Sequence, residues 1–174
     1  MAIEQTLVII KPDAMRREIL GEVLNALSET RLKIVGSKTV KVSDELAEKH
    51  YASLCSKPYF QNSINYITGK LHGENRVMAL VYEGENAVKV IRSVCGVTNP
   101  EEADPLSIRG KYGRVTTKNE FENIIHASGN PEEAEYEIKL WFKPEELTHL
   151  IYPTEKKKIT IEELVWKASK QSLL

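Results

Sequence analysis

Short apolar runs alternate along this chain with segments whose apolar residues recur at helical spacing. The run from Thr6 to Ile10 is continuous and predicts a buried central strand. The strand should end at Lys11-Pro12-Asp13, because proline has no N–H for a sheet ladder. Residues 32–42 alternate loosely and predict a second strand. Between the two strands an amphipathic helix is expected from the spacing of Leu20, Val23, Leu24 and Leu27.

The middle of the chain repeats this alternation of strand and helix patterns. Ser43 followed by two acidic residues is a typical helix start. We therefore predict, in order, a helix over residues 43–54, a second helix from Pro58 to Ile67, a polar turn over 69–75, a strand over 76–82 and a helix over 88–95 that stops at Gly96.

The last third of the chain is less regular. Residues 97–122 contain several prolines and glycines and predict a long irregular loop, which in a compact domain is usually functional or disordered. Ile124 and Ile125 then suit a buried strand that leads into His126. Pro131 opens a helix, since proline is tolerated in the first turn. From Tyr152 the chain is first basic and then amphipathic.

This order of elements predicts one α/β sandwich with a ferredoxin-like βαββαβ core. Such a core has a four-stranded antiparallel sheet with helices on one face. The residues over 43–67 add a helical hairpin to it. We place the domain at residues 1–151 and expect residues 152–174 to form a C-terminal extension packed on the same domain.

Composition adds few constraints. The 174 residues are 41% hydrophobic and 28% charged, as in globular proteins. The formal net charge is −1, so the chain has no overall positive charge that would suggest nucleic-acid binding. The N-terminus lacks the pattern of a secretory signal, and the chain contains no apolar run near the ~20 residues that span a bilayer. Cys55 and Cys95 are far apart, and we expect free thiols in a reducing cytoplasm.

His126 is the main candidate for chemistry. A histidine at the end of a buried strand is held rigidly, and neutral imidazole is a good nucleophile near pH 7. A single histidine in such a place is more often a core residue with both nitrogens hydrogen-bonded. Glu137 lies at the edge of the following helix and either orients the imidazole or is an ordinary surface glutamate.

Three cations lie at the ends of predicted elements or in the loop, where they can reach a phosphate. Lys11 follows the first strand, Arg92 lies near a helix end and Arg109 precedes a glycine in the loop. Taken singly, Lys11 is more often a strand-end charge in water, and Arg92 is nearly as well explained as a cation that caps its helix. The chain contains no glycine-rich phosphate loop and no histidine spacing of a metal site, so a phosphate site must be built from side chains.

Seven short motifs, taken together, resemble the nucleoside diphosphate kinase family over residues 4–150. The early Lys-Pro-Asp and the Asn-Ile-Ile-His-x-Ser run are highly specific. In chain order the motifs are Ile10-Lys11-Pro12-Asp13, His50-Tyr51, Lys57-Pro58-Tyr59-Phe60, Thr98-Asn99-Pro100, Ser107-Ile108-Arg109-Gly110, Asn123-Ile124-Ile125-His126-Ala127-Ser128 and Glu137-x3-Trp141-Phe142.

The resemblance implies a ping-pong transfer of the γ-phosphate of a nucleoside triphosphate to a diphosphate through a phosphohistidine at His126. Magnesium would bridge the nucleotide phosphates, without ligands from protein side chains. Ser128 and Glu137 match residues that brace the histidine. The remaining implied contacts are phosphate binding by Lys11, Arg92 and Arg109, hydroxyl hydrogen bonds from Tyr51 and Thr98, a bond from Asn123 to the sugar, and stacking of the base on Tyr59, where the family usually has phenylalanine.

The chain departs from the usual family pattern near the site. Lys111 to Glu122 is longer than the usual connection. The family usually has a Gly-Arg pair just before the asparagine; here that pair is either replaced by Phe121-Glu122 or displaced to Gly113-Arg114. Gly129 stands where aspartate usually follows the serine, and residues 70–75 look like a small insertion. These differences bear on the loop and its subunit contacts rather than on the histidine.

Two other classes of protein remain as alternatives. A nucleotide-binding module that has lost turnover would not need a nucleophile. An RNA-binding ferredoxin-like domain would need exposed aromatics and a basic face, while aromatics are 7% of this chain. The resemblance also implies a homo-oligomer, a hexamer with a tetramer as the alternative. The cysteines, the short apolar runs and the near-zero net charge predict a cytoplasmic protein that binds neither membranes nor specific nucleic acids.

Overall fold

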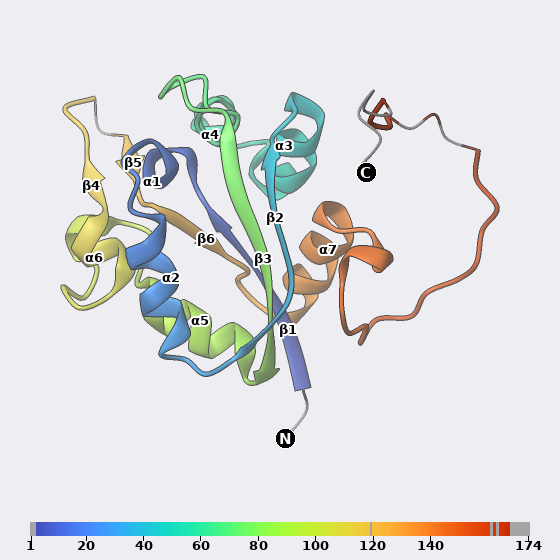
Figure 1. The fold of residues 1–174 in the computed structure, drawn as a ribbon. Coiled ribbons are helices and arrows are strands. Elements are labelled where there is room, and N and C mark those ends of the chain that lie inside the picture. Colours follow the sequence, from blue (N-terminus) through green and yellow to red (C-terminus); the bar gives the residue numbers. More distant parts are fainter. Residues whose placement is uncertain (1–2, 119, 161, 163, 168–174) are drawn as a thin grey trace, which may run out of the picture.

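The centre of the fold is a four-stranded antiparallel sheet with the strand order β2-β3-β1-β6 (Figure 1). This computed structural model describes residues 3–118, 120–160, 162 and 164–167. The sheet confirms the predicted one, although its first strand begins earlier than expected. Its strands are β1 (Ile3–Ile10), β2 (Lys33–Lys41), β3 (Arg76–Glu85) and β6 (Ile125–Ala127).

The first strand contributes to two separate cores because successive side chains point to opposite faces of a sheet. Leu7 and Ile9 belong to one core, and Val8 and Ile10 to the other, each of them fully buried. The continuous apolar run at residues 6–10 therefore reflects a central strand covered on both sides.

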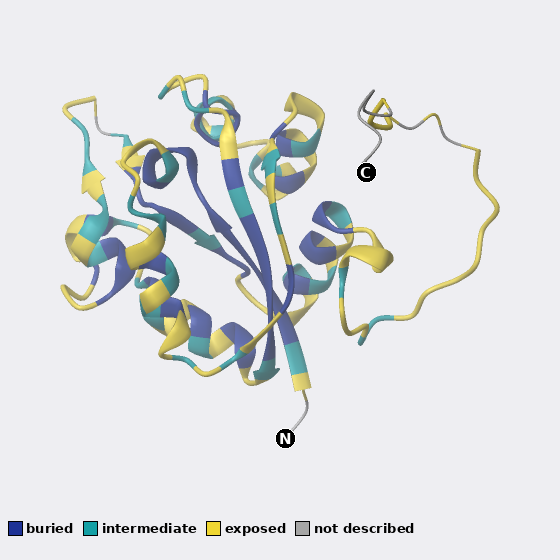
Figure 2. Ribbon diagram, viewed as in Figure 1, coloured by how far each residue is buried: buried dark blue, intermediate teal, exposed yellow. Residues whose placement is uncertain are grey.

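Helices cover both faces of the sheet, whereas we had expected them on one face (Figures 1 and 2). The two helices of the split βαβ units pack on one side, as the ferredoxin-like pattern requires. The added helical hairpin and the last helix bury the other side. The first group is α2 (Leu20–Ser28) and α5 (Ala87–Cys95), and the second is α3 (Asp44–His50), α4 (Phe60–Ile67) and α7 (Pro131–Trp141), with a short 3-10 turn η1 (Ala52–Leu54) between α3 and α4.

Several helix starts lie where the sequence predicts them. The Ser43 hydroxyl accepts a hydrogen bond from the N–H of Leu46 at 3.1 Å, and the Asn130 side chain accepts one from Glu133 at 2.8 Å. Proline also opens α1 (Pro12–Arg16), a short helix directly after β1 that periodicity alone did not predict.

Residues 97–122 form a chain of short elements, so our prediction of a long irregular loop was wrong. They contain the 3-10 turn η2 (Pro100–Glu102), the helix α6 (Ile108–Tyr112) and a small hairpin of β4 (Arg114–Val115) and β5 (Phe121–Glu122). None is long enough to show a hydrophobic period. Capping of α6 by the Ser107 hydroxyl, which accepts from Gly110 at 3.2 Å, was the detectable local signal.

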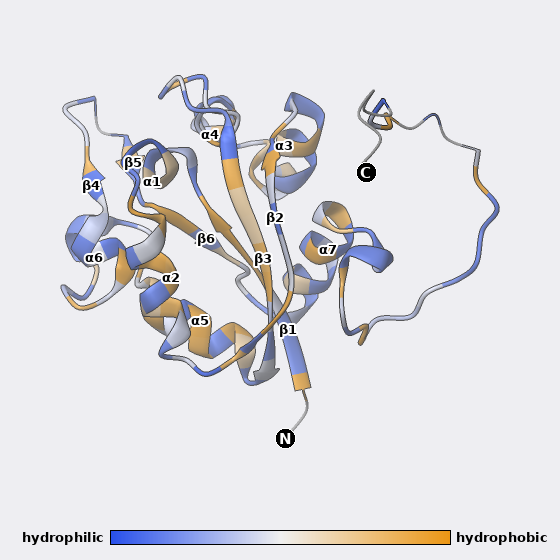
Figure 3. Ribbon diagram, in the orientation of Figure 1, coloured by the Kyte–Doolittle hydropathy of each residue, from blue (hydrophilic) through white to orange (hydrophobic). Residues whose placement is uncertain are grey.

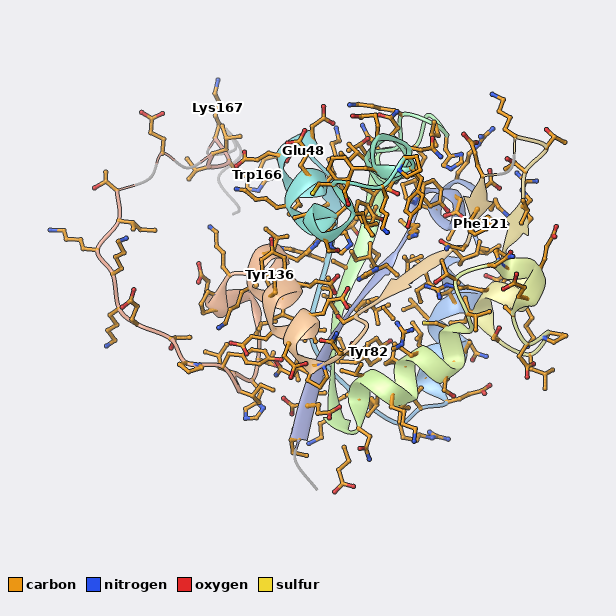
Figure 4. The ribbon with its side chains drawn as sticks, turned by 180° about the vertical axis from the view of Figure 1, so that it is seen from behind. Glu48, Tyr82, Phe121, Tyr136, Trp166 and Lys167 are labelled. Carbon is orange, nitrogen blue, oxygen red and sulfur yellow. The ribbon has the colours of Figure 1, made fainter. Side chains whose placement is uncertain are left out.

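The chain leaves the domain after Tyr152, which packs on the edge of one core. The described residues from Pro153 onward are exposed, so the structure does not show the extension packed on its own domain as we expected (Figures 1 and 2). Hydrophobic residues in this segment, including Trp166, face solvent (Figures 3 and 4).

Two further observations concern the whole described part of the chain. Cys55 is exposed and Cys95 buried, and both are free thiols, as predicted. None of the helices in the described residues has the length and apolar character needed to cross a membrane.

The packing of α2 on the sheet predicts a large effect of truncating Leu27. This side chain is fully buried among the residues under α2 and α5. Leu27→Ala should lower the free energy of unfolding by about 2–5 kcal/mol, measured by urea denaturation. Leu164, which is fully exposed in the segment after Tyr152, provides the matched control, and Leu164→Ala should change stability by less than about 0.5 kcal/mol. Equal effects of the two changes would show that α2 is not packed as described.

Candidate functional site

The pairing of β6 with β1 decides where His126 points. Ile9 pairs with His126 in the register, with Val8 opposite Ala127 and Ile10 opposite Ile125. Cross-strand partners share a face of the sheet, so His126 lies on the side covered by α3 and α7. Lys11, two residues after Ile9, continues the same face. The strand register therefore brings the predicted nucleophile and the first predicted cation together.

The imidazole of His126 is held by Glu137 of α7. Its Nε2 lies 2.8 Å from one carboxylate oxygen and 3.0 Å from the other. Ser128 donates from its hydroxyl to the same carboxylate at 2.6 Å, and that hydroxyl accepts from the backbone N–H of Leu7 in β1 at 3.1 Å. Ser128 and Glu137 are almost fully buried, so this chain of bonds fixes the ring between sheet and helix.

His50, at the end of α3, is a member of this cluster to which the sequence analysis gave no role. Its ring packs edge-on against that of His126 with centroids 4.5 Å apart. The Trp141 indole N–H donates to Nδ1 of His50 at 3.3 Å, and this Nδ1 is 3.5 Å from Glu137. Burial lowers the pKa of His50 to about 3, with the nearby His126 as the next cause, so the ring is neutral.

His126 is also neutral, because its pKa lies well below the usual value. Burial is the largest cause, followed by the positive charges of Lys11, Arg109 and Arg92. Burial raises the pKa of Glu137, while His50 and Ser128 act in the opposite direction. A neutral ring that donates its Nε2–H to a carboxylate has its lone pair on Nδ1. The arrangement therefore presents Nδ1 as a nucleophile.

Lys11 and Asn123 form a second linked pair. The buried Lys11 ammonium donates to the side-chain oxygen of Asn123 at 2.8 Å, and the Asn123 amide donates to the backbone oxygen of Thr98 at 3.0 Å. Burial lowers the pKa of Lys11 to about 7, with Arg109 adding to the shift and Asp13 opposing it. Three predicted site residues from different parts of the sequence thus meet within hydrogen-bonding distance.

The backbone before His126 makes a tight turn at Ile124. This residue has a φ of +67°, and the N–H of Ile125 donates to the carbonyl of Asn123 at 2.6 Å across it, as in a γ-turn. Such a conformation is strained for a β-branched residue. The Asp13 carboxylate accepts the N–H of Ile124 at 3.0 Å and holds the turn in place.

Arg109 is held from within the chain rather than free in a loop. Its guanidinium donates to the carbonyl of Gly96 at 2.7 Å and to that of Ile125 at 2.8 Å, and its Nε has no partner within the described residues. Burial lowers the pKa of Arg109, but guanidinium stays charged. The arginine thus bridges the end of α5 and the strand that carries His126.

The remaining predicted residues are placed less closely. Arg92 is an exposed residue of α5 whose charge still acts on His126, and Tyr51 packs on His50 with ring centroids 4.7 Å apart. Thr98 is exposed. Tyr59, just before α4, is 51% exposed, and no contact joins it to the cluster within the described residues. The structure thus assembles most of the predicted site and leaves Tyr59 at its outer edge.

A magnesium ion does not suit the one cluster of possible metal ligands in the described residues. That cluster is His50, His126 and Glu137, whose donor atoms lie within 4.8 Å of one another. Magnesium prefers oxygen ligands, and this carboxylate is already bonded to His126 and Ser128. The cations around His126 instead suit a phosphate chain, whose own oxygens can bind the ion.

Asp13, His50 and Trp141 contact residues of the candidate site, although single-residue reasoning did not select them. All three lie inside the motifs that carry the family resemblance: Asp13 follows Lys11 by two residues, His50 directly precedes Tyr51, and Trp141 follows Glu137 by four. That proximity was the available signal. Their roles depend on contacts between residues far apart in the chain, such as Trp141 with His50, which sequence spacing does not reveal.

Comparisons with known proteins identify the family of this chain. A family model described as nucleoside diphosphate kinase matches residues 4–147. The nucleoside diphosphate kinase of Thermococcus kodakarensis is 46% identical over 145 residues, covering 83% of this chain and 80% of the relative. That of Staphylococcus epidermidis is 44% identical over 152 residues, covering 87% of this chain and 96% of the relative.

Solved structures show the same likeness. A transition-state mimic of the Borrelia burgdorferi nucleoside diphosphate kinase with vanadate and ADP has a TM-score of 0.76 and 33% identity, covering 88% of this chain and 94% of that one. The Halobacterium salinarum enzyme in complex with CDP has a TM-score of 0.76 and 35% identity, covering 87% and 95%. This chain therefore belongs to the nucleoside diphosphate kinase family and transfers phosphate between nucleoside tri- and diphosphates.

Proposed function

We propose that the transfer runs through a covalent phosphohistidine at Nδ1 of His126. The observation that carries this proposal is the bond from Nε2 of a neutral His126 to Glu137, which leaves the Nδ1 lone pair free. In the first half-reaction, an Nδ1–P bond forms while the bond from the γ-phosphorus to the β–γ bridging oxygen breaks, and the diphosphate leaves with that electron pair. In the second, a terminal oxygen of another diphosphate attacks the phosphorus and releases the neutral imidazole.

Glu137 has a specific part in this step. As the Nδ1–P bond forms, the ring gains positive charge, and the carboxylate next to Nε2–H stabilises it. Ser128 keeps one carboxylate oxygen in place and links it to β1. The ring therefore cannot rotate away while the phosphoryl group passes in line between donor and acceptor.

The three cations would neutralise the charge that moves between oxygens during transfer. Lys11 and Arg109 are buried close to the strand that carries His126, and Arg92 acts from α5. Phosphoryl transfer requires mainly positioning and such electrostatic stabilisation. Magnesium is the divalent ion we propose, bound by phosphate oxygens and water, where it would add further positive charge.

The nucleotide contacts follow the family resemblance. Asn123 would bond the sugar, and Tyr51 and Thr98 would donate hydroxyl hydrogen bonds to the phosphates. The half-exposed Tyr59 is free to stack on the base, and stacking ignores base identity, which gives broad nucleotide specificity. The bound ADP and CDP of the Borrelia and Halobacterium enzymes support nucleotides of both base types as ligands.

We also propose that the protein acts in the cytoplasm, which its free thiols support. The division into a kinase domain of residues 1–151 and an extension of 152–174 stays a prediction. A match of the family model that ends at residue 147 supports it.

Replacing His126 should abolish the covalent step. Incubation with γ-labelled triphosphate and no acceptor should place acid-labile label on the unaltered protein and none on His126→Ala, because the alanine has no nucleophile. The variant should still bind nucleotide. His149→Ala is the matched control, since that histidine is remote from the cluster and mostly exposed, and it should be labelled normally. Exchange at the normal rate in His126→Ala would end the proposal, and binding without labelling in the unaltered protein would favour a nucleotide-binding module.

Removal of a buried cation should slow the reaction more than it weakens base binding. Lys11→Ala and Arg109→Ala should each lower kcat on the order of 10²-fold or more, because each stabilises charge that develops during transfer. Lys111→Ala is the control, since Lys111 is an exposed neighbour in α6 and should keep kcat unchanged. Unaltered kcat in both buried-site variants would show that the phosphates lie elsewhere.

We propose that the chain assembles as a hexamer, with a tetramer as the alternative. Arg109 is held by hydrogen bonds within its own chain, so its position does not require a neighbouring subunit. What supports assembly is the family resemblance and the exposed apolar side chains of Val97 and Leu106 in the same segment. Light scattering at micromolar concentration should give a multiple of the 19.7 kDa chain, and a monomer mass would contradict the prediction.

A further inference from the structure

The ring of Tyr66 lies against the ammonium group of Lys11. Tyr66 belongs to α4 and is 8% exposed, and Lys11 Nζ is 4.9 Å from its ring centroid. The face of an aromatic ring attracts a cation, and the attraction is largest where water is excluded. Tyr66 has no role in the mechanism above, although the face of its ring is placed to favour the charged form of Lys11.

The charge on Lys11 needs such support. Its pKa of about 7 means that it is protonated below this pH and loses its proton as the pH rises through it. Burial and the positive Arg109 act against the charge, and Asp13 acts for it. The titratable groups that face Lys11 are Asp13 from α1, His50 from α3, Tyr66 from α4, Arg109 from α6 and His126 from β6.

Two segments hold Tyr66 in this position, and both depart from the usual spacing of the family. His72, in the turn after α4, packs edge-on against the Tyr66 ring with centroids 5.0 Å apart. The same His72 lies 3.6 Å from the carboxylate of Glu122 in β5, and Glu122 forms an ion pair with Arg114 in β4. His72 and Glu122 are both nearly buried, so the contact on Tyr66 is held in turn by the β4–β5 hairpin.

We propose that Tyr66 is a positioning residue for phosphoryl transfer, which keeps Lys11 charged and directed at the phosphates through the face of its ring. The inference rests on the proposed role of Lys11. It also gives the turn over residues 69–75 and the β4–β5 hairpin a function, since they brace the ring.

The test compares an aliphatic with an aromatic replacement across pH. In a ping-pong reaction, kcat/KM for the triphosphate reports the free enzyme in its first half-reaction. Loss of a desolvated cation–π contact should lower the pKa of Lys11 by about one unit. For Tyr66→Leu, the ratio of wild-type to variant kcat/KM should therefore be about 10 near pH 8.5, should fall to about 2 near pH 6 and should approach about 1 near pH 5. Taking the ratio at each pH cancels the titration of the nucleotide.

Tyr66→Phe is the matched control because it keeps the ring and removes only the hydroxyl. Its kcat/KM should stay within about twofold of wild type at every pH. Tyr66→Met is a second aliphatic variant, which fills the space differently should the leucine variant fail to fold. A loss in the aliphatic variants that is equal at all pH values would show a merely structural role. No loss, or a phenylalanine variant as impaired as the leucine one, would also overturn the proposal.

A double variant separates this inference from the proposed function. In Lys11→Ala, the further change Tyr66→Leu should leave kcat/KM unchanged at every pH, because the group it acts through is absent. Wild-type activity in Lys11→Ala alone would refute the proposed role of the lysine. A strong loss in Lys11→Ala together with an unimpaired Tyr66→Leu would refute only the role of Tyr66.

Discussion

The hydrogen bond between Nε2 of His126 and the Glu137 carboxylate is the interaction on which the site depends. An imidazole has two nitrogens, and only a fixed acceptor on one of them makes the other a nucleophile. The carboxylate is itself held by Ser128, which is tied to the backbone of β1. Sheet, nucleophile and α7 are therefore joined through one buried carboxylate, and movement of any of them would misplace Nδ1.

Burial is the main reason that His126 is neutral, and the cations around this bond add to it. The same buried cations reduce the stability of the folded state. Buried charges without a full set of partners are destabilising. Lys11 and Arg109 are both buried, and each lowers the pKa of His126. The same positive field that destabilises the empty site matches the negative charge of a phosphate chain. The arrangement thus exchanges some folding stability for electrostatic complementarity to the substrate, as functional sites commonly do.

The elements that could be predicted from sequence are those with a hydrophobic pattern that continues over several residues or with a strong local signal. The run at residues 6–10, the helical spacing from Leu20 to Leu27 and the proline at 131 each specify structure within a few residues of themselves. The segment 97–122 was mispredicted because its helix and hairpin are too short to show a period. The two-sided cover of the sheet was missed because the cover on the second face comes from α3, α4 and α7, whose packing partners are distant in sequence.

The site was predictable as a set of residues but not as a geometry. Motif resemblance brought together Lys11, Asn123 and His126, while the part played by Asp13 required the fold. Asp13 accepts the N–H of Ile124, Lys11 donates its backbone N–H to the Ile124 carbonyl at 2.8 Å, and its side chain bonds Asn123. A positive φ at a β-branched residue costs about 1–3 kcal/mol and persists only where its surroundings over-determine it.

Here the surroundings are the Lys-Pro-Asp motif itself. The two most specific motifs of the chain, separated by 112 residues at Lys11 and Asn123, are therefore one structural unit. Proline at 12 ends β1 and starts α1, which places Asp13 where it meets the Ile124 N–H. The turn at Ile124 then sends the chain into β6 with His126 opposite Ile9. Each motif supplies what the other needs, since a strained turn requires an external clamp and a buried Asp13 carboxylate requires a donor.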